Sequence, residues 1–298
     1  MHKKSKNFLH QAISIWLIAL MLMVGNTFAG TETPFAYGLL FHIEKPGTPP
    51  SHLFGTMHSE EPQVLSLPEP VKNAFDNADT LALELKLEPA ALQTSMLGML
   101  LQDERELSDI IGPQLYKETI TATTENGIPE NAIKKFKPWG VIMLLSMPPV
   151  RTGQFLDLTL YQSATAQGKI LKGLETVEEQ LAVFDTLPEI EQVEILRDTL
   201  ENRHQFKQMF NELLAAYLKR ELGTLLQLSH KYGPSNSEIA QRMEERLINK
   251  RNRLMVDRMN PILKQGNAFI AIGALHLPGQ KGVLNLLKQR GFQVTTVY

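Results

Sequence analysis

The chain has 298 residues, of which 43% are hydrophobic and 21% are charged, a balance typical of globular proteins. It contains no cysteine, which excludes disulfide frameworks, cysteine-based zinc sites, a thiol nucleophile and a lipid anchor on an N-terminal cysteine. The formal net charge is −2, whereas nucleic-acid-binding domains usually carry a basic patch, so we expect no nucleic-acid partner.

The first 29 residues differ in composition from the rest of the chain. Lysines near the N-terminus precede an apolar run over residues 12–24, and the small residue Ala29 follows. This pattern is typical of a secretory signal peptide, so we predict cleavage of residues 1–29 and a periplasmic or secreted protein. The apolar run is shorter than the roughly 20 residues of a membrane span. The alternative is a membrane anchor at residues 12–24, the only contact with a membrane that we expect.

The N-terminal part of the mature chain alternates strands and a helix. Residues 37–44 and 51–57 are predicted strands, and the Pro/Gly-rich loop between them favours an antiparallel pair. A helix is expected over 69–78. Residues 80–87 form the next predicted strand, because leucines alternate along it with other residues.

A largely helical insertion is predicted over about residues 89–265. A helix over 156–167 precedes a short predicted strand at 170–174. Thr176 and Glu179 have the spacing of a capping box, which marks the start of the next helix.

The C-terminal part returns to strands. Residues 268–272 form a continuous apolar run, as expected for a strand covered on both faces, and 293–298 form the last strand after a helix over 279–290. The predicted fold class is therefore α/β (α+β). A mixed sheet is built from the N- and C-terminal segments around a large helical insertion, in one domain over residues 30–298.

Two Gly-x-x-His sequences stand at predicted strand ends. His58 closes Gly55-Thr56-Met57-His58, and His276 closes Gly273-Ala274-Leu275-His276. Sites of open α/β sheets form outside the carboxyl ends of the strands, where two such histidines can meet. Neutral imidazole is the commonest metal ligand in proteins, so the pair predicts a metal site. The competing interpretation is two unrelated turns.

Glu84 is the third candidate for this site. It lies opposite the leucine face of its strand, and in isolation it would be a residue that faces solvent. The short connection from His58 predicts a β-α-β unit whose two strands are parallel neighbours. Glu84 would then point to the same end of the sheet as His58, and two histidines with one carboxylate leave coordination positions open for water.

These segments resemble the TraB/GumN family, which includes the TIKI proteases. The resemblance begins with the Gly-Thr-Met-His sequence and Leu83-Glu84-Leu85, and it ends with Gly273-Ala274-Leu275-His276-Leu277-Pro278-Gly279. Further stretches between them fit in the same order: Lys137-Pro138-Trp139, Gly173-Leu174-Glu175-Thr176 and Arg251-Asn252. The resemblance implies an EreA/ChaN-like fold, related to erythromycin esterases and a haem-binding lipoprotein group. It also implies two functional histidines and an essential glutamate, which here are His58, His276 and Glu84.

The resemblance further implies a divalent-metal-dependent hydrolase, most simply a peptidase acting on a peptide or protein. We expect His58 and His276 to bind the ion, which is Mn, Co or Zn, and Glu84 to be its third ligand or the general base. Glu175 is expected to orient a histidine or the water. Arg251 and Asn252 are expected to bind a substrate carbonyl or carboxylate, with a salt bridge inside the helical region as the alternative for Arg251.

A non-catalytic protein on the same fold is the alternative function. Such a protein would bind haem, a metal or a partner protein outside the cytoplasm. The sequence also leaves the position of Asp157 open, because the family often has Gly-x-Asp before this helix and this chain has Gln154-Phe155-Leu156-Asp157.

Overall fold

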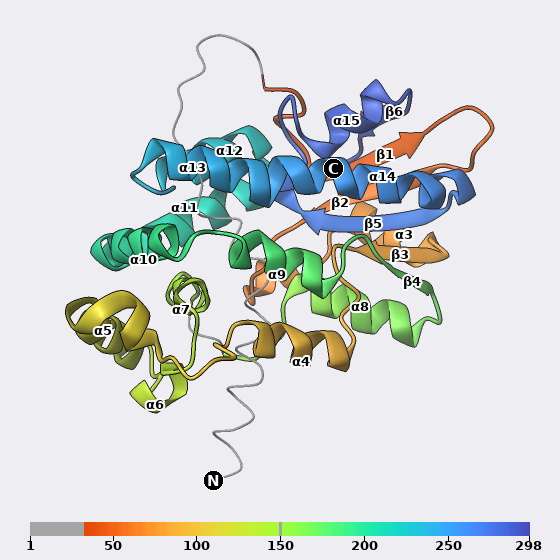
Figure 1. The fold of residues 1–298 in the computed structure, drawn as a ribbon. Coiled ribbons are helices and arrows are strands. Elements are labelled where there is room, and N and C mark those ends of the chain that lie inside the picture. Colours follow the sequence, from red (N-terminus) through yellow and green to blue (C-terminus); the bar gives the residue numbers. More distant parts are fainter. Residues whose placement is uncertain (1–32, 149–150) are drawn as a thin grey trace.

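A six-stranded mixed sheet forms the centre of the molecule (Figure 1). The computed structural model describes residues 33–148 and 151–298, so the predicted leader at 1–29 lies outside the described residues. The strand order is β4-β3-β5-β2-β1-β6. The strands are β1 (Leu40–Glu44), β2 (Ser51–Thr56), β3 (Thr80–Leu83), β4 (Ile170–Gly173), β5 (Ala268–Gly273) and β6 (Gln293–Thr296).

Strand directions divide the sheet into two parts. Strands β4, β3, β5 and β2 are mutually parallel, so their carboxyl ends lie at one edge. Strand β1 is antiparallel to both β2 and β6. These pairings confirm the antiparallel pair predicted for the first two strands and the mixed α/β fold class. The sheet joins strands from both ends of the chain, and β4 from the middle adds one edge.

The prediction that the strands before His58 and Glu84 are neighbours is wrong. Strand β5, from the C-terminal part of the chain, lies between β2 and β3 and pairs in parallel with both. The physical reason is burial. The sequence AFIAIG of β5 is apolar along almost its whole length, and residues Ala268–Ile272 are fully buried. A strand of this kind is most stable where it is paired on both sides and covered on both faces.

Strand β3 is shorter than predicted. It ends at Leu83, and all four of its residues are buried rather than alternating between core and solvent. The alternation of leucines up to Leu87 continues beyond the paired segment, because these side chains remain buried after the strand ends. Glu84 therefore begins the segment after β3 and is only 3% exposed, although the alternation pattern alone would place it in solvent.

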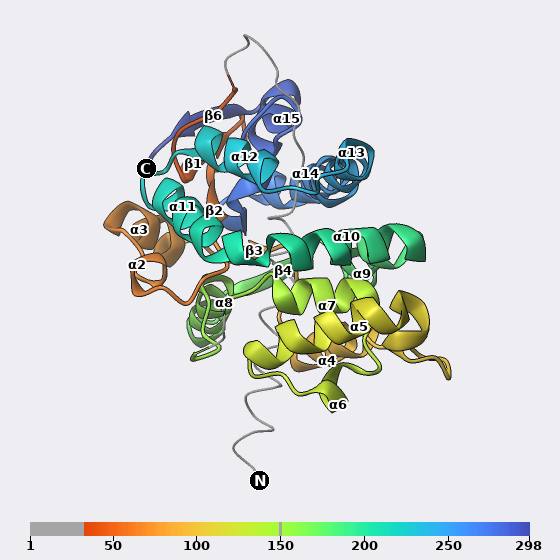
Figure 2. The ribbon, with the colours of Figure 1, turned by 90° about the vertical axis from the view of Figure 1, so that its left-hand side faces the viewer.

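Helices cover the sheet and form a separate group beside it. Figures 1 and 2 show α5, α6, α7 and α10 grouped away from the strands, whereas α14 crosses the sheet along β5. None of the helices in the described part of the chain is long and apolar enough to cross a membrane. The helices are α2 (Pro62–Leu65), α3 (Glu69–Asn77), α4 (Pro89–Gly98), α5 (Leu107–Glu125), α6 (Glu130–Ile133), α7 (Pro138–Leu145), α8 (Leu156–Ala166), α9 (Val177–Asp185), α10 (Glu189–Asn202), α11 (Phe206–Leu218), α12 (Leu222–Lys231), α13 (Ser237–Glu244), α14 (Lys250–Gln265) and α15 (Val283–Gln289), with 3₁₀ turns η3 (Arg203–Gln205) and η5 (Ala274–His276) and a π-helical turn η4 (Glu245–Asn249).

Local signals placed the helix ends with mixed accuracy. The capping box at the start of α9 is present, since Thr176 accepts from the Glu179 backbone N–H and Glu179 accepts from that of Thr176. The C-terminal helix is shorter than predicted and begins at Val283. Gly279 has φ of +90°, a left-handed conformation that an α-helix excludes.

Gly55 allows β2 to contact the turn that carries His276. A Cβ atom at residue 55 would lie 2.7 Å from Leu277 Cδ1 and 3.2 Å from Ala274 Cα. We expect Gly55→Ala to lower the free energy of unfolding by about 1–3 kcal/mol, because extra atoms in a packed interior force neighbours apart. Urea denaturation measures this loss. A variant as stable as the wild type would show that the turn moves without cost.

Candidate functional site

The predicted site residues converge at the carboxyl edge of the four parallel strands. His58 follows β2, Glu84 follows β3, Glu175 follows β4, and His276 ends the turn η5 after β5. All four side chains are buried, with exposures of 6%, 3%, 6% and 0%. Parallel strands bring their carboxyl ends together whatever their separation in sequence, and this places four chemically active side chains in one interior region.

Asn252 fixes the protonation of His276. The His276 Nδ1 lies 2.6 Å from the Oδ1 of Asn252, whose own Nδ2 donates to the carbonyl of Lys281 at 2.8 Å. Because the amide nitrogen is used by that carbonyl, Oδ1 is the acceptor and His276 Nδ1 carries the hydrogen. Burial lowers the pKa of His276 well below its usual value. The nearby positive charge of Arg251 lowers the pKa further, and the negative charge of Glu175 opposes this shift without cancelling it. The ring is therefore neutral, with a free lone pair on Nε2.

Arg251 joins two buried carboxylates. Its Nη2 donates to Glu84 Oε2 and to Glu175 Oε2, both at 2.6 Å, and its Nε donates to Glu175 Oε1 at 2.9 Å. Burial opposes the charge of Arg251, but the carboxylates of Glu175 and Glu84 outweigh it and raise the pKa of the guanidinium. The salt bridge thus connects α14 to the sheet rather than lying within the helical region.

Glu84 is held on both oxygens. While Oε2 accepts from Arg251, Oε1 accepts the backbone N–H of Gly273 at 2.7 Å. Glu175 is also fully engaged, since Gln180 Nε2 donates to its Oε2 at 3.0 Å. Glu175 therefore contacts Arg251 and Gln180 and makes no hydrogen bond to either histidine of the site.

A π-helical turn precedes the two residues that α14 contributes. The turn η4 ends at Asn249, and α14 begins at Lys250, so Arg251 and Asn252 lie in its first turn. Short π-helical segments occur frequently at functional sites, where they change which side chains face inward. Both residues are buried here. A charged side chain is rarely buried without a partner, and Arg251 has Glu84 and Glu175 as its partners.

Asp157 belongs to the site, which the sequence analysis left open. Its Oδ2 lies 3.7 Å from His58 Nδ1, and its Oδ1 accepts a hydrogen bond from the Thr56 hydroxyl at 2.9 Å. The first turn of α8 carries Asp157, two residues after Phe155, whose ring packs on that of His58 with centroids 3.6 Å apart. The acidic residue following Gln154-Phe155-Leu156 was the available sequence signal.

Four buried histidine and aspartate atoms of this region have no hydrogen-bond partner among the described residues. They are both ring nitrogens of His58, the Nε2 of His276 and the Oδ2 of Asp157. A buried polar atom without a partner costs free energy, so such a group often contacts a ligand, an ion or water. The unpartnered atoms are two imidazoles and a carboxylate oxygen, which are ligand types that divalent metals use.

The atoms that could bind a metal ion occur as two pairs, each made of a histidine nitrogen and a carboxylate oxygen. His276 Nε2 lies 3.8 Å from Glu84 Oε1, and His58 Nδ1 lies 3.7 Å from Asp157 Oδ2. Such separations suit two ligands that each lie about 2 Å from one ion. Within residues 33–148 and 151–298, however, no three or more His, Asp or Glu side chains form a group arranged to hold a metal ion. The types of these atoms fit a metal ion, but the side chains as they lie supply only two ligands at each place.

The formal charge of the region also fits a cation. Glu84, Glu175 and Asp157 are three carboxylates, and the cationic side chain of Arg251 is bonded to Glu84 and Glu175. With all of them ionised and His276 neutral, the four side chains carry a charge of −2. A divalent cation would balance this charge in an interior where an uncompensated charge is costly.

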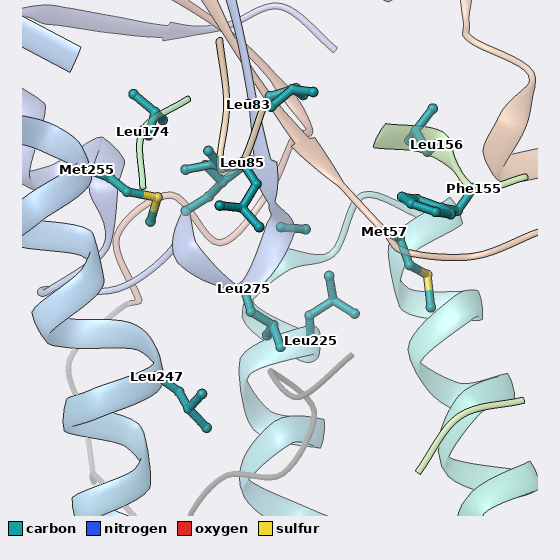
Figure 3. Close-up of a cluster of buried hydrophobic side chains, with 14 of the residues drawn as sticks. Met57, Leu83, Leu85, Phe155, Leu156, Leu174, Leu225, Leu247, Met255 and Leu275 are labelled. Atoms are coloured by element: carbon teal, nitrogen blue, oxygen red, sulfur yellow. The ribbon is translucent and has the colours of Figure 1, made fainter. Parts of the chain in front are cut away.

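Apolar side chains surround the strand ends (Figure 3). They come from strands, from the η5 turn and from helices, so residues distant in sequence exclude water together. Electrostatic interactions are stronger in such surroundings than in water. The labelled members are Met57, Leu83, Leu85, Phe155, Leu156, Leu174, Leu225, Leu247, Met255 and Leu275.

The sequence model of the TraB/PrgY/gumN family matches residues 39–296. The chain belongs to this family. The match begins just before β1 and ends at the last residue of β6, so it includes the whole sheet and every strand end of the site.

Curated relatives of this family member fall into two groups. Metalloprotease TIKI2 of Danio rerio is 26% identical over 86% of this chain and 60% of its own length, and metalloprotease TIKI1 of Homo sapiens is 24% identical over 83% and 59%. The uncharacterized protein YbaP of Shigella flexneri is 24% identical over 83% of this chain and 90% of its own length. The chain thus spans about 60% of the length of the TIKI relatives. No solved structure matches it, and the expected EreA/ChaN-like relation stays a prediction.

Proposed function

We propose that this family member is a divalent-metal-dependent hydrolase that cleaves peptide bonds. The observation that carries the proposal is the set of unpartnered buried donors on His58, His276 and Asp157 at one edge of the sheet. The names of the TIKI relatives, which are metalloproteases, support the same class of reaction. A divalent ion bound here would lower the pKa of a bound water to about 7.

The protein residues have separate roles in this proposal. His276 offers its Nε2 lone pair, and Asn252 holds the ring in the tautomer that makes this possible. His58 and Glu84 are the other two proposed ligands, and binding would have to draw the three side chains together, because no three such residues are already arranged around an ion in the described residues. Glu84 suits ligation better than proton transfer, because Arg251 and the Gly273 N–H already donate to its oxygens.

Asp157 is the general base in the proposed reaction. No described residue donates a hydrogen bond to its Oδ2, whereas the Thr56 hydroxyl orients the carboxylate through Oδ1. Asp157 accepts a proton from the water that attacks the peptide carbonyl carbon. The C–N bond then breaks, the proton passes to the leaving amine, and the products are a carboxylate and an amine. Arg251 and Glu175 position Glu84 and do not contact substrate.

The proposed hydrolase acts outside the cytoplasm after removal of residues 1–29. The lysines, apolar run and Ala29 of the N-terminal segment support this export. Mass spectrometry of the protein recovered from a periplasmic fraction should give an N-terminus at Gly30. Recovery of intact Met1 in the membrane fraction would favour the anchor at residues 12–24.

The metal content of purified protein tests the site directly. We expect close to one divalent ion per chain in the wild type, and a loss of at least about tenfold in metal affinity in both His58→Ala and His276→Ala. His204→Ala is the matched control, because His204 is exposed on η3 and its ring bonds only a local carbonyl. Elemental mass spectrometry after dialysis against Mn, Co or Zn provides the measurement, and circular dichroism verifies the fold.

Two results would remove the metal proposal. One is a wild type that refuses all three ions. The other is equal metal retention in the two site variants and the His204→Ala control. The same fold would then serve a non-catalytic role in binding haem or a partner protein, with the buried histidines as ligand contacts.

A further inference from the structure

A narrow pocket adjoins the proposed catalytic side chains and belongs to none of the roles above. Glu84 and Asp157 are among the residues that line it, so the pocket adjoins one proposed metal ligand and the proposed base. Its walls come from the segment after β3, from α4 and from Phe155. The surface of the pocket is overwhelmingly apolar.

The walls are aliphatic at the level of single residues. Leu85 and Leu87 follow β3, and Ala91 and Leu92 lie on the first two turns of α4. Phe155, which also packs on His58, is part of the lining. Figure 3 shows Leu85 and Phe155 among the buried side chains around the strand ends. An apolar side chain that enters the pocket would leave water and gain contacts with these walls.

One amide oxygen in the pocket has no hydrogen-bond partner in the part of the chain that the structure describes. Gln180 is 3% exposed, and its Nε2 donates to Glu175 Oε2 at 3.0 Å, which fixes the orientation of the amide. Its Oε1 is consequently the atom left without a donor, in a residue that lines the pocket. A peptide N–H is a donor of the right kind, since side-chain amides commonly accept backbone hydrogens.

We propose that this pocket selects an aliphatic residue of the substrate next to the scissile bond, with the N–H of the bound peptide donating to Gln180 Oε1. The inference rests on the proposed peptidase function and names its substrate class, which is peptides with leucine, isoleucine or methionine at one position. Glutamate and aspartate are disfavoured there, because the carboxylates of Glu84 and Asp157 repel a third.

Two neighbouring alanines of α4 offer a matched test. Ala91 lines the pocket, whereas Ala90 is exposed and lies outside it. Ala91→Leu should fill the pocket, and Ala90→Leu adds the same atoms to solvent. Digestion of a mixed pool of capped hexapeptides, read by mass spectrometry, should show an aliphatic preference in the wild type. We expect Ala91→Leu to lower kcat/KM for leucine peptides by about 10–200-fold and Ala90→Leu to change it less than about twofold.

An enlarged pocket gives a second readout that does not depend on loss. Leu92→Ala should extend the preference to phenylalanine, because it removes side-chain volume from the wall. A preference for lysine or arginine in the wild type would overturn the proposal in favour of recognition by Asp157. Equal cleavage at all residues, or equal behaviour of the Ala91→Leu and Ala90→Leu variants, would also overturn it.

Binding to metal-free protein separates this inference from the proposed reaction. Ligand-observed NMR with N-acetyl-leucine N-methylamide should show binding that the capped glycine and capped lysine compounds lack, and that Ala91→Leu abolishes. Such binding without any hydrolysis would support the specificity of the pocket and contradict the proposed peptidase function. Hydrolysis at the same rate whatever the side chain would support the peptidase function and contradict the specificity of the pocket.

Discussion

Replacement of Arg251 by methionine is expected to lower the free energy of unfolding by about 3–5 kcal/mol. The substitution keeps an unbranched side chain but removes the cationic side chain that is bonded to Glu84 and Glu175, which are 3% and 6% exposed. Two carboxylates would then remain in the interior without a counter-charge. The cost therefore comes mainly from the groups left behind rather than from the lost attraction.

The same helix provides a control for this measurement. Arg253 pairs with Glu245 through side chains that are about half exposed, and surface pairs contribute about 0–1 kcal/mol. Urea denaturation of Arg251→Met and Arg253→Met, followed by circular dichroism, compares a buried and an exposed pair two residues apart. Similar midpoints for both variants would show that the two glutamates become protonated or hydrated without a large penalty.

Asp157→Asn is expected to lower kcat for a cleaved peptide by about 10²–10⁴, the usual contribution of a general base. Asparagine has nearly the same shape and can still accept the hydrogen bond from the Thr56 hydroxyl, but it cannot take a proton from water. We expect metal content and thermal stability to stay close to those of the wild type. Asp257→Asn, on the exposed face of α14, controls for the change of charge.

Glu84→Gln completes the comparison of the two candidate bases. If Asp157→Asn remains active while Glu84→Gln retains its metal and loses activity, then Glu84 is the base and Asp157 orients His58. A loss of metal in Glu84→Gln, together with an inactive but metal-bound Asp157→Asn, is the result that the proposed roles predict. Elemental mass spectrometry and peptide cleavage on the same samples distinguish the two outcomes.

Local sequence patterns determined the elements that carry the site. Turn residues and apolar runs identified the strands before His58, Glu84 and His276, and the short strand before Glu175, to within a few residues. These signals are local, because strand and helix periods and capping residues act over a few positions. The rule that parallel strands present their carboxyl ends at one edge predicts that these residues lie along the same edge of the sheet.

Only the tertiary structure decided which strands are neighbours and which side chains meet. Strand β5 lies between β2 and β3 because this position buries an apolar strand on both sides. The paired residues of β2 and β5 are more than 200 positions apart in the sequence. The contacts of Asp157 with Thr56 and of Arg251 with two glutamates arise in the same way. The local sequence determined at which strand or helix end each polar side chain lies. Long-range packing determined the partners of these side chains, because the energy of each pair depends on burial that no local pattern encodes.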